Sequence, residues 1–110
     1  MDHVSLIELA DEHVRAAANS SSGRSSRTIH GGSDHRLRQT LMALAAGRIL
    51  DEHENPGEAT LQVLHGSVRL TSGDQLWDGG PGSYVVIPAG RHALEALTDC
   101  AVLLTVVPTV

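Results

Sequence analysis

The chain has 110 residues, a length that gives one domain with a single core. Its net charge is −5 and arginine supplies all eight basic residues, which argues against nucleic-acid binding and excludes Schiff-base lysine chemistry. No stretch has the roughly 20 apolar residues of a membrane span, and no signal peptide is recognisable. A cytoplasmic protein with no membrane partner is therefore expected.

An amphipathic helix is predicted over residues 5–18. Ser5 and Glu8 have the spacing of a capping box, and apolar residues recur at helical intervals as far as Ala17. The apolar face must cover either the chain's own core or a neighbouring subunit, while His3 and His13 are expected to be exposed. The Ser- and Gly-rich residues 19–26 then predict a linker, which divides the chain into an N-terminal segment, 1–26, and a main domain, 27–110.

Short strands separated by glycine-rich turns are predicted for the main domain. The predicted strands are 27–30, 37–45, 48–53, 59–65, 67–72, 75–78, 83–87, 92–97 and 101–107. No helix lies between successive strands, so a parallel βαβ fold is excluded and a sandwich or barrel is favoured. The last run is apolar on both faces, as in a central strand. The single cysteine, Cys100, precedes this run and is expected to be a buried packing residue.

Two glycine-bounded stretches carry histidines at a characteristic spacing. In the first, Gly47 is followed after five residues by His53, then Asn55, and the stretch ends at Gly66. In the second, five residues separate Gly82 from the sequence Pro-Ala-Gly-Arg-His that ends at His92. In order and spacing these stretches resemble the two motifs of the cupin superfamily, except that one residue separates Gly90 from His92 where the second motif has two. The resemblance covers residues 37–107 and implies an all-β fold, an antiparallel jelly-roll β-barrel preceded by the N-terminal α-helix.

The resemblance also implies a metal site, which this chain retains in part. Cupins typically hold a divalent metal with two histidines and a glutamate from the first motif and a histidine from the second. His53 and His92 match two of these ligands, Asn55 stands in place of the second histidine, and Ala59 replaces the glutamate. The implied cofactor is one divalent metal, Fe, Mn, Ni or Zn, held by an incomplete set of ligands, or no cofactor at all.

Strand alternation gives an independent prediction for the same residues. If Ala59 points inward, the apolar residues at 61 and 63 do so too. The same alternation, extended back without a bulge, places His53 and Asn55 on the inner side. In the later strand His92 shares a face with Leu94. A histidine on an apolar inner face needs a partner, which could be a metal, a ligand, a buried water or the other histidine.

Other polar residues are weaker candidates. Gln39 could join the mouth of the pocket if it is the inward residue of its strand. Glu54 and Glu58 are expected to face solvent, although either could complete a metal site if the intervening loop bulges. His65 is expected at a turn on the barrel rim. The stretch that contains His30 and His35 (residues 28–35) is either an ordinary loop or a lid that supplies a third ligand.

Three functional hypotheses remain open. The first is a barrel that binds a small polar molecule, with His53 and His92 as catalytic or metal-binding candidates and Asn55 and Gln39 as ligand contacts. The second is a non-catalytic ligand-binding or sensor module without metal. The third is an oligomerisation domain whose functional part is the N-terminal helix. A homodimer is expected in each case, because barrel edges and an amphipathic helix both need cover.

Overall fold

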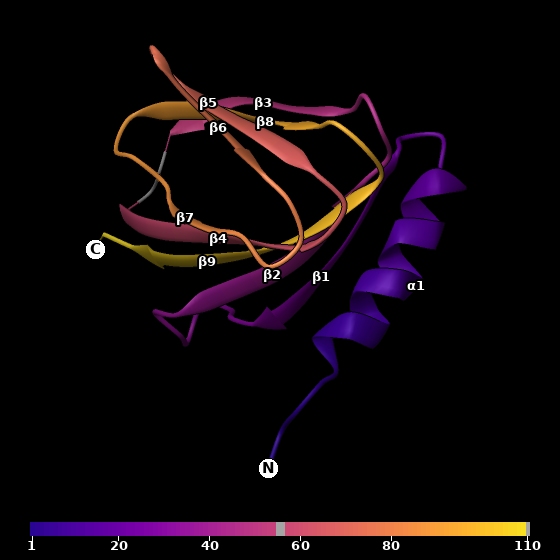
Figure 1. The fold of residues 1–110 in the computed structure, drawn as a ribbon. Helices are drawn as coiled ribbons and strands as arrows, with labels where there is room; N and C mark the ends of the chain where they lie inside the picture. Colours follow the sequence, from indigo (N-terminus) through magenta and orange to yellow (C-terminus); the bar gives the residue numbers. More distant parts are fainter. Residues whose placement is uncertain (55–56, 110) are drawn as a thin grey trace.

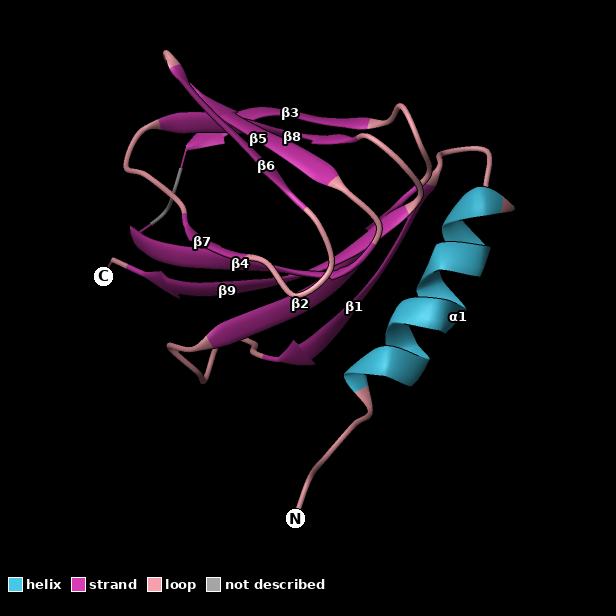
Figure 2. Cartoon of the chain, in the orientation of Figure 1, coloured by secondary structure: helices cyan, strands magenta, loops and turns pink. Residues whose placement is uncertain are grey.

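The structure, a computed structural model, describes residues 1–54 and 57–109, and among these the side chains of residues 52 and 53 are left out of the description. One helix and nine strands make up the described chain (Figures 1 and 2). They are α1 (Leu6–Ala18), β1 (Arg24–His30), β2 (Arg38–Leu44), β3 (Ile49–Glu54), β4 (Gly57–His65), β5 (Val68–Ser72), β6 (Gln75–Gly79), β7 (Tyr84–Val86), β8 (Arg91–Ala96) and β9 (Cys100–Pro108). Each predicted strand is confirmed, with ends that differ by a few residues.

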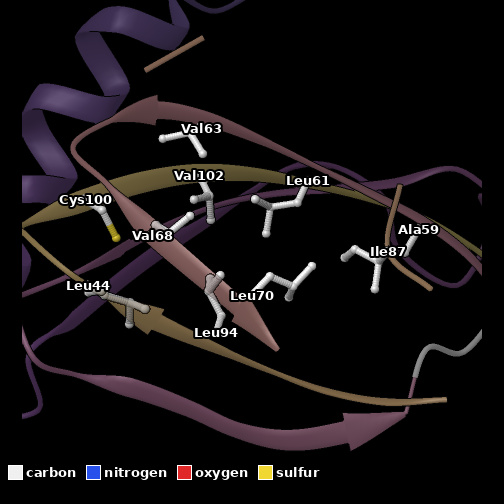
Figure 3. Close-up of a cluster of buried hydrophobic side chains, with 11 residues drawn as sticks. Leu44, Ala59, Leu61, Val63, Val68, Leu70, Ile87, Leu94, Cys100 and Val102 are labelled. Carbon is white, nitrogen blue, oxygen red and sulfur yellow. The ribbon is translucent and has the colours of Figure 1, made fainter. Parts of the chain in front are cut away.

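The strands form two antiparallel sheets that face each other as a jelly roll. The larger sheet has the order β1-β2-β9-β4-β7 and the smaller has the order β3-β8-β5-β6. β9 lies between β2 and β4, which confirms the central position predicted from its apolar character on both faces. The two sheets enclose the core, whose side chains converge from both sides (Figure 3). The predicted all-β jelly-roll barrel with an N-terminal helix is therefore confirmed.

Helix α1 lies against the outer face of the larger sheet (Figure 1). It begins after Ser5, whose hydroxyl accepts a hydrogen bond from the Glu8 amide at 3.3 Å. Small residues allow the helix to approach the sheet closely. The resulting buried cluster consists of Ala10, Ala17, Ala43 and Ala101, with Val14 and Leu64 beside them. The apolar face of the helix thus covers the chain's own barrel, one of the two alternatives that the sequence leaves open.

Two expectations for the N-terminal region are wrong. The predicted linker over residues 19–26 is shorter, because β1 already begins at Arg24 and pairs with Leu44 of β2. Ser25 and Ser26 lie in this edge strand, where polar side chains can face solvent, whereas Ser20, Ser21 and Ser22 lie in the turn between α1 and β1. His13 is not exposed: its side chain retains 14% of its accessible surface, and Nδ1 lies 2.6 Å from the Ser25 hydroxyl of β1.

The described helix has 13 residues and lacks the length and apolar character of a membrane-crossing helix. Cys100 is fully buried at the start of β9, as expected. Burial raises the pKa of its thiol to about 11, so the group is protonated at neutral pH and is a packing residue rather than a nucleophile.

Candidate functional site

Strand pairing brings the two motif stretches together. β3, from the first stretch, is the direct neighbour of β8, from the second. In this pairing His53 is the register partner of His92, and Glu54 is the partner of Arg91. The register shifts between Leu50 and His53, so the alternation along β3 contains an irregularity that sequence spacing does not reveal.

His92 is the one buried polar residue among the described side chains, with 5% of its surface accessible. It shares the inward face of β8 with Leu94 and Ala96, as strand alternation predicts. Ala59, Leu61 and Val63 of β4 also face the core, which confirms the predicted parity of that strand. The second motif therefore delivers its histidine to the interior between the two sheets.

A cavity lies beside His92 between the two sheets. Its walls are otherwise apolar and comprise Met42, Leu50, Leu61, Leu70, Ile87, Leu94, Val102 and Leu104. The centre of a water molecule can move within about 20 Å³ of this cavity. This is enough room for one water molecule. A larger ligand requires a lining side chain to move, and the unbranched thioether of Met42 is the most adaptable of them.

The described residues do not form a complete metal site. No group of three or more His, Cys, Asp or Glu side chains lies close enough to hold an ion within the described part of the chain. Ala59, at the position of the motif glutamate, is buried in the core and supplies no ligand atom. The side chain of His53 and the whole of Asn55 lie outside the described residues. Among the described residues, His92 is the only His, Cys, Asp or Glu whose side chain lines the cavity. Catalytic zinc requires three protein ligands.

Gln39 does not lie at the mouth of this cavity. Met42 faces the cavity, so alternation along β2 turns Gln39 to the opposite, outer face of the sheet. There its amide Nε2 donates a hydrogen bond to the Thr105 hydroxyl at 3.2 Å. The expectation that Gln39 points inward is therefore wrong. Alternation could not show which face of β2 points inward, because apolar residues are buried on both faces. Leu41 and Ala43, on the face of Gln39, are as buried as the residues that face the core.

The remaining candidates lie on the surface. Glu54 and Glu58 are exposed, as expected. His65 is exposed at the last position of β4, consistent with a place at the rim. His30 and His35 are exposed at the β1–β2 connection, where their ring centroids are 4.6 Å apart and His35 Nδ1 lies 2.9 Å from the Gly31 carbonyl oxygen. None of these side chains lines the cavity beside His92.

The sequence analysis missed a second hollow next to the cavity. Arg38 and Thr40 share the face of β2 that carries Met42 and line this hollow together with the β1–β2 connection. The signal was present in the sequence, because strand alternation groups Arg38, Thr40 and Met42 on one face. Which of the two faces points inward could not be read from β2 alone.

Comparison with solved structures identifies the class of fold. The chain resembles a conserved protein of unknown function from Streptococcus pyogenes, with a TM-score of 0.73 and 29% identity over 83% of this chain and 79% of that one. A cupin superfamily protein from Desulfitobacterium hafniense gives a TM-score of 0.72 at 23% identity, covering 78% of each chain. An RmlC-like cupin from Desulfovibrio desulfuricans gives 0.72 at 23% identity over 100% of this chain and 99% of that one.

Two antiparallel sheets with both motif stretches in adjacent strands define a jelly-roll fold. The solved cupin structures share this fold, so the chain is a cupin-fold barrel with a helix packed on its larger sheet. Comparisons with protein-family profiles and with curated proteins give no match.

Proposed function

We propose that this cupin-fold protein binds a small molecule between its two sheets, with His92 as the main polar contact. The observation that carries this proposal is the position of His92, which is the one buried polar side chain of the described residues and lines an otherwise apolar cavity. Small-molecule sites are typically apolar cavities in which a few placed polar groups orient the ligand. The barrel interior has this composition.

Histidine gives such a site a defined chemical capacity. A neutral imidazole can donate a hydrogen bond from one ring nitrogen and accept one at the other. Because it titrates near neutral pH, it can also take up or release a proton from a bound ligand. The surrounding aliphatic side chains lower the local dielectric and strengthen a hydrogen bond to the ligand. The arrangement supports orientation of a bound ligand.

His53 and Asn55 enter the proposal through their positions in the chain. Position 53 stands across from His92 in the β3–β8 pairing, and directly opposite residues of an antiparallel pair share a face of the sheet. A second imidazole there would allow one histidine to act as acid and the other as base without a metal. Asn55, two positions on, would offer an amide that orients the ligand.

A divalent metal would need His53, His92 and Asn55 together as ligands. The carboxylate common to cupin sites is replaced by Ala59, and an amide oxygen is a weaker ligand than a carboxylate for Fe, Mn, Ni or Zn. The proposed binding therefore relies on hydrogen bonding to His92, and metal binding is a separate outcome of the experiment. The apolar lining favours a ligand-binding or sensor module over a metalloenzyme.

Elemental analysis and native mass spectrometry of the untagged protein test this proposal. His92→Ala removes the imidazole from the cavity, and His65→Ala is the matched control because that histidine is exposed at the end of β4. We expect a bound metal ion or small molecule in the wild type and in His65→Ala, and its loss from His92→Ala. If no species is bound and the melting temperature does not change on adding Zn²⁺, Ni²⁺, Mn²⁺ or Fe²⁺, the protein does not bind a metal in the barrel. Equal occupancy in all three proteins would contradict the role of His92.

A further inference from the structure

A hollow of about 400 Å³ lies at the end of the sandwich where β1 connects to β2, the end at which β9 also terminates (Figure 1). Its lining combines apolar surface with hydroxyl groups and one guanidinium, and no carboxylate of the described residues contributes to it. The lining residues are Thr28, Gly31, Gly32, Ser33, Arg38 and Thr40. Arg38 is the only charged residue among them, so the hollow carries a positive charge although the whole chain is acidic.

The guanidinium of Arg38 is available to a ligand. Among the described residues it takes part in no ion pair and no hydrogen bond, in contrast to Arg69, which binds Asp78 with two hydrogen bonds of 2.8 and 2.9 Å. The stem of Arg38 runs beside the β1–β2 connection: a Cβ placed on Gly31 would lie 3.6 Å from Arg38 Cγ. The side chain of Arg38 therefore lies within contact distance of this connection.

The same connection offers backbone donors. Gly32 has a φ of 103°, a conformation that favours glycine. Its carbonyl oxygen accepts a hydrogen bond from the His35 amide at 3.3 Å. The amides of Gly32 and Ser33 donate no hydrogen bond within the part of the chain that the structure describes. The two residues that carry these amides line the hollow together with Thr28, Thr40 and Arg38. Backbone amides, hydroxyls and a guanidinium are the donors with which proteins bind anions.

The hollow adjoins the His92 cavity along β2. Thr40 lines the hollow, and Met42, two residues further on the same face, lines the cavity. Thr40 is also the register partner of Leu104, another residue of the cavity wall. Two residues of a strand span about 6.6 Å, so a short molecule can reach from one space to the other once the side chain of Met42 moves aside.

We infer that the ligand of this barrel is a small carboxylic acid, with its carboxylate at Arg38 and its apolar body directed past Met42 toward His92. This inference rests on the proposed function, because it assigns the charged end of the molecule bound there. One guanidinium matches the single charge of a carboxylate and its planar pair of oxygens. A phosphate monoester carries a charge of about −1.5 to −2 at neutral pH, for which one arginine is a poorer match.

NMR titration with butyrate tests the inference, with butyramide as the uncharged probe of the same shape. We expect butyrate to shift the amide signals of Gly32 and Ser33 and to bind the Arg38→Gln variant at least about tenfold more weakly. Arg36→Gln is the matched control, because Arg36 is an exposed arginine two positions away that does not line the hollow. Butyramide should bind wild type and Arg38→Gln equally weakly.

Two results would overturn the inference: no shift at Gly32 and Ser33 on adding butyrate, or an equal loss of affinity in Arg36→Gln and Arg38→Gln. Failure of the proposed function gives a different pattern. In that case butyrate would still shift these amides through Arg38, but His92→Ala would leave its affinity unchanged. Inorganic phosphate that binds more tightly than butyrate would contradict the choice of a carboxylate.

Discussion

His53 of β3 is the register partner of His92 of β8, so the two motif stretches, nearly 40 residues apart in the chain, are adjacent in the smaller sheet. The neighbouring pair, Glu54 and Arg91, continues the same register. Strand pairing alone therefore assembles the candidate site, and the turns that flank each stretch set the register. The position of the candidate site therefore depends on the pairing of β3 with β8.

The contact between α1 and the sheet predicts a size limit at Ala17. This residue is 1% exposed and packs with Ala43 and Ala101 of the sheet. Ala17→Leu should lower the free energy of unfolding by about 1–3 kcal/mol, because the added methylenes force the helix away from the strands. Ala16→Leu on the exposed face should change it by less than about 0.5 kcal/mol. Urea denaturation measures both, and similar values for the two variants would contradict the close packing.

Cys100 predicts a loss of stability at alkaline pH. Burial raises the pKa of its thiol from 9.0 to about 11, so the folded state holds the proton more tightly than the unfolded state does. The resulting contribution to stability is complete below pH 9 and disappears as the pH rises through about 11. The chain has no lysine to titrate in this range. Urea denaturation from pH 8.5 to pH 11 should show a steeper decline for wild type than for Cys100→Ala. Parallel curves would contradict the assignment.

A homodimer is expected through the uncovered edge of the larger sheet. α1 covers part of the outer face, whereas β7 is an edge strand on which Tyr84 and Val86 are 59% and 64% exposed. Edge strands with exposed apolar residues favour pairing with another chain. Light scattering at micromolar concentration should report a dimer for wild type and a monomer for Val86→Glu. Leu76→Glu on edge strand β6 is the control and should remain dimeric. A monomeric wild type would refute the expectation.

The positions of the strands along the chain could be predicted from the sequence because glycine, proline or polar turns separate them. Interior faces could be predicted where one face is apolar and the other polar, as with His92 and Ala59. The prediction of which side chains point inward failed on β2. Its outer face lies partly under α1 and is as apolar as its inner face. The inward position of Gln39 therefore had no reliable basis. The burial of His13 was missed for a related reason. Its partner Ser25 belongs to β1, but the serines and glycine of residues 19–26 predict a linker there.

The positive hollow could be predicted only in part, because strand alternation groups Arg38 with Thr40 but does not place the β1–β2 connection. Arg38 belongs to it only because the β1–β2 connection folds back beside the β2 strand, a contact between Gly31 and Arg38 that requires the actual path of the chain. A histidine in a motif carries its own signal in its spacing, whereas an isolated arginine does not. The residues that line the hollow were therefore less predictable than the barrel itself.

The methyl group of Met42 reports directly on whether a ligand enters the cavity beside His92. The chain has two methionines, Met42 in the cavity wall and Met1 exposed at the N-terminus, so selective methyl labelling gives one reporter and one internal control. Butyrate or Zn²⁺ should shift the Met42 signal in wild type, leave the Met1 signal in place, and lose its effect on Met42 in His92→Ala. A Met42 signal that responds to neither probe, or that responds equally in wild type and His92→Ala, would contradict the account.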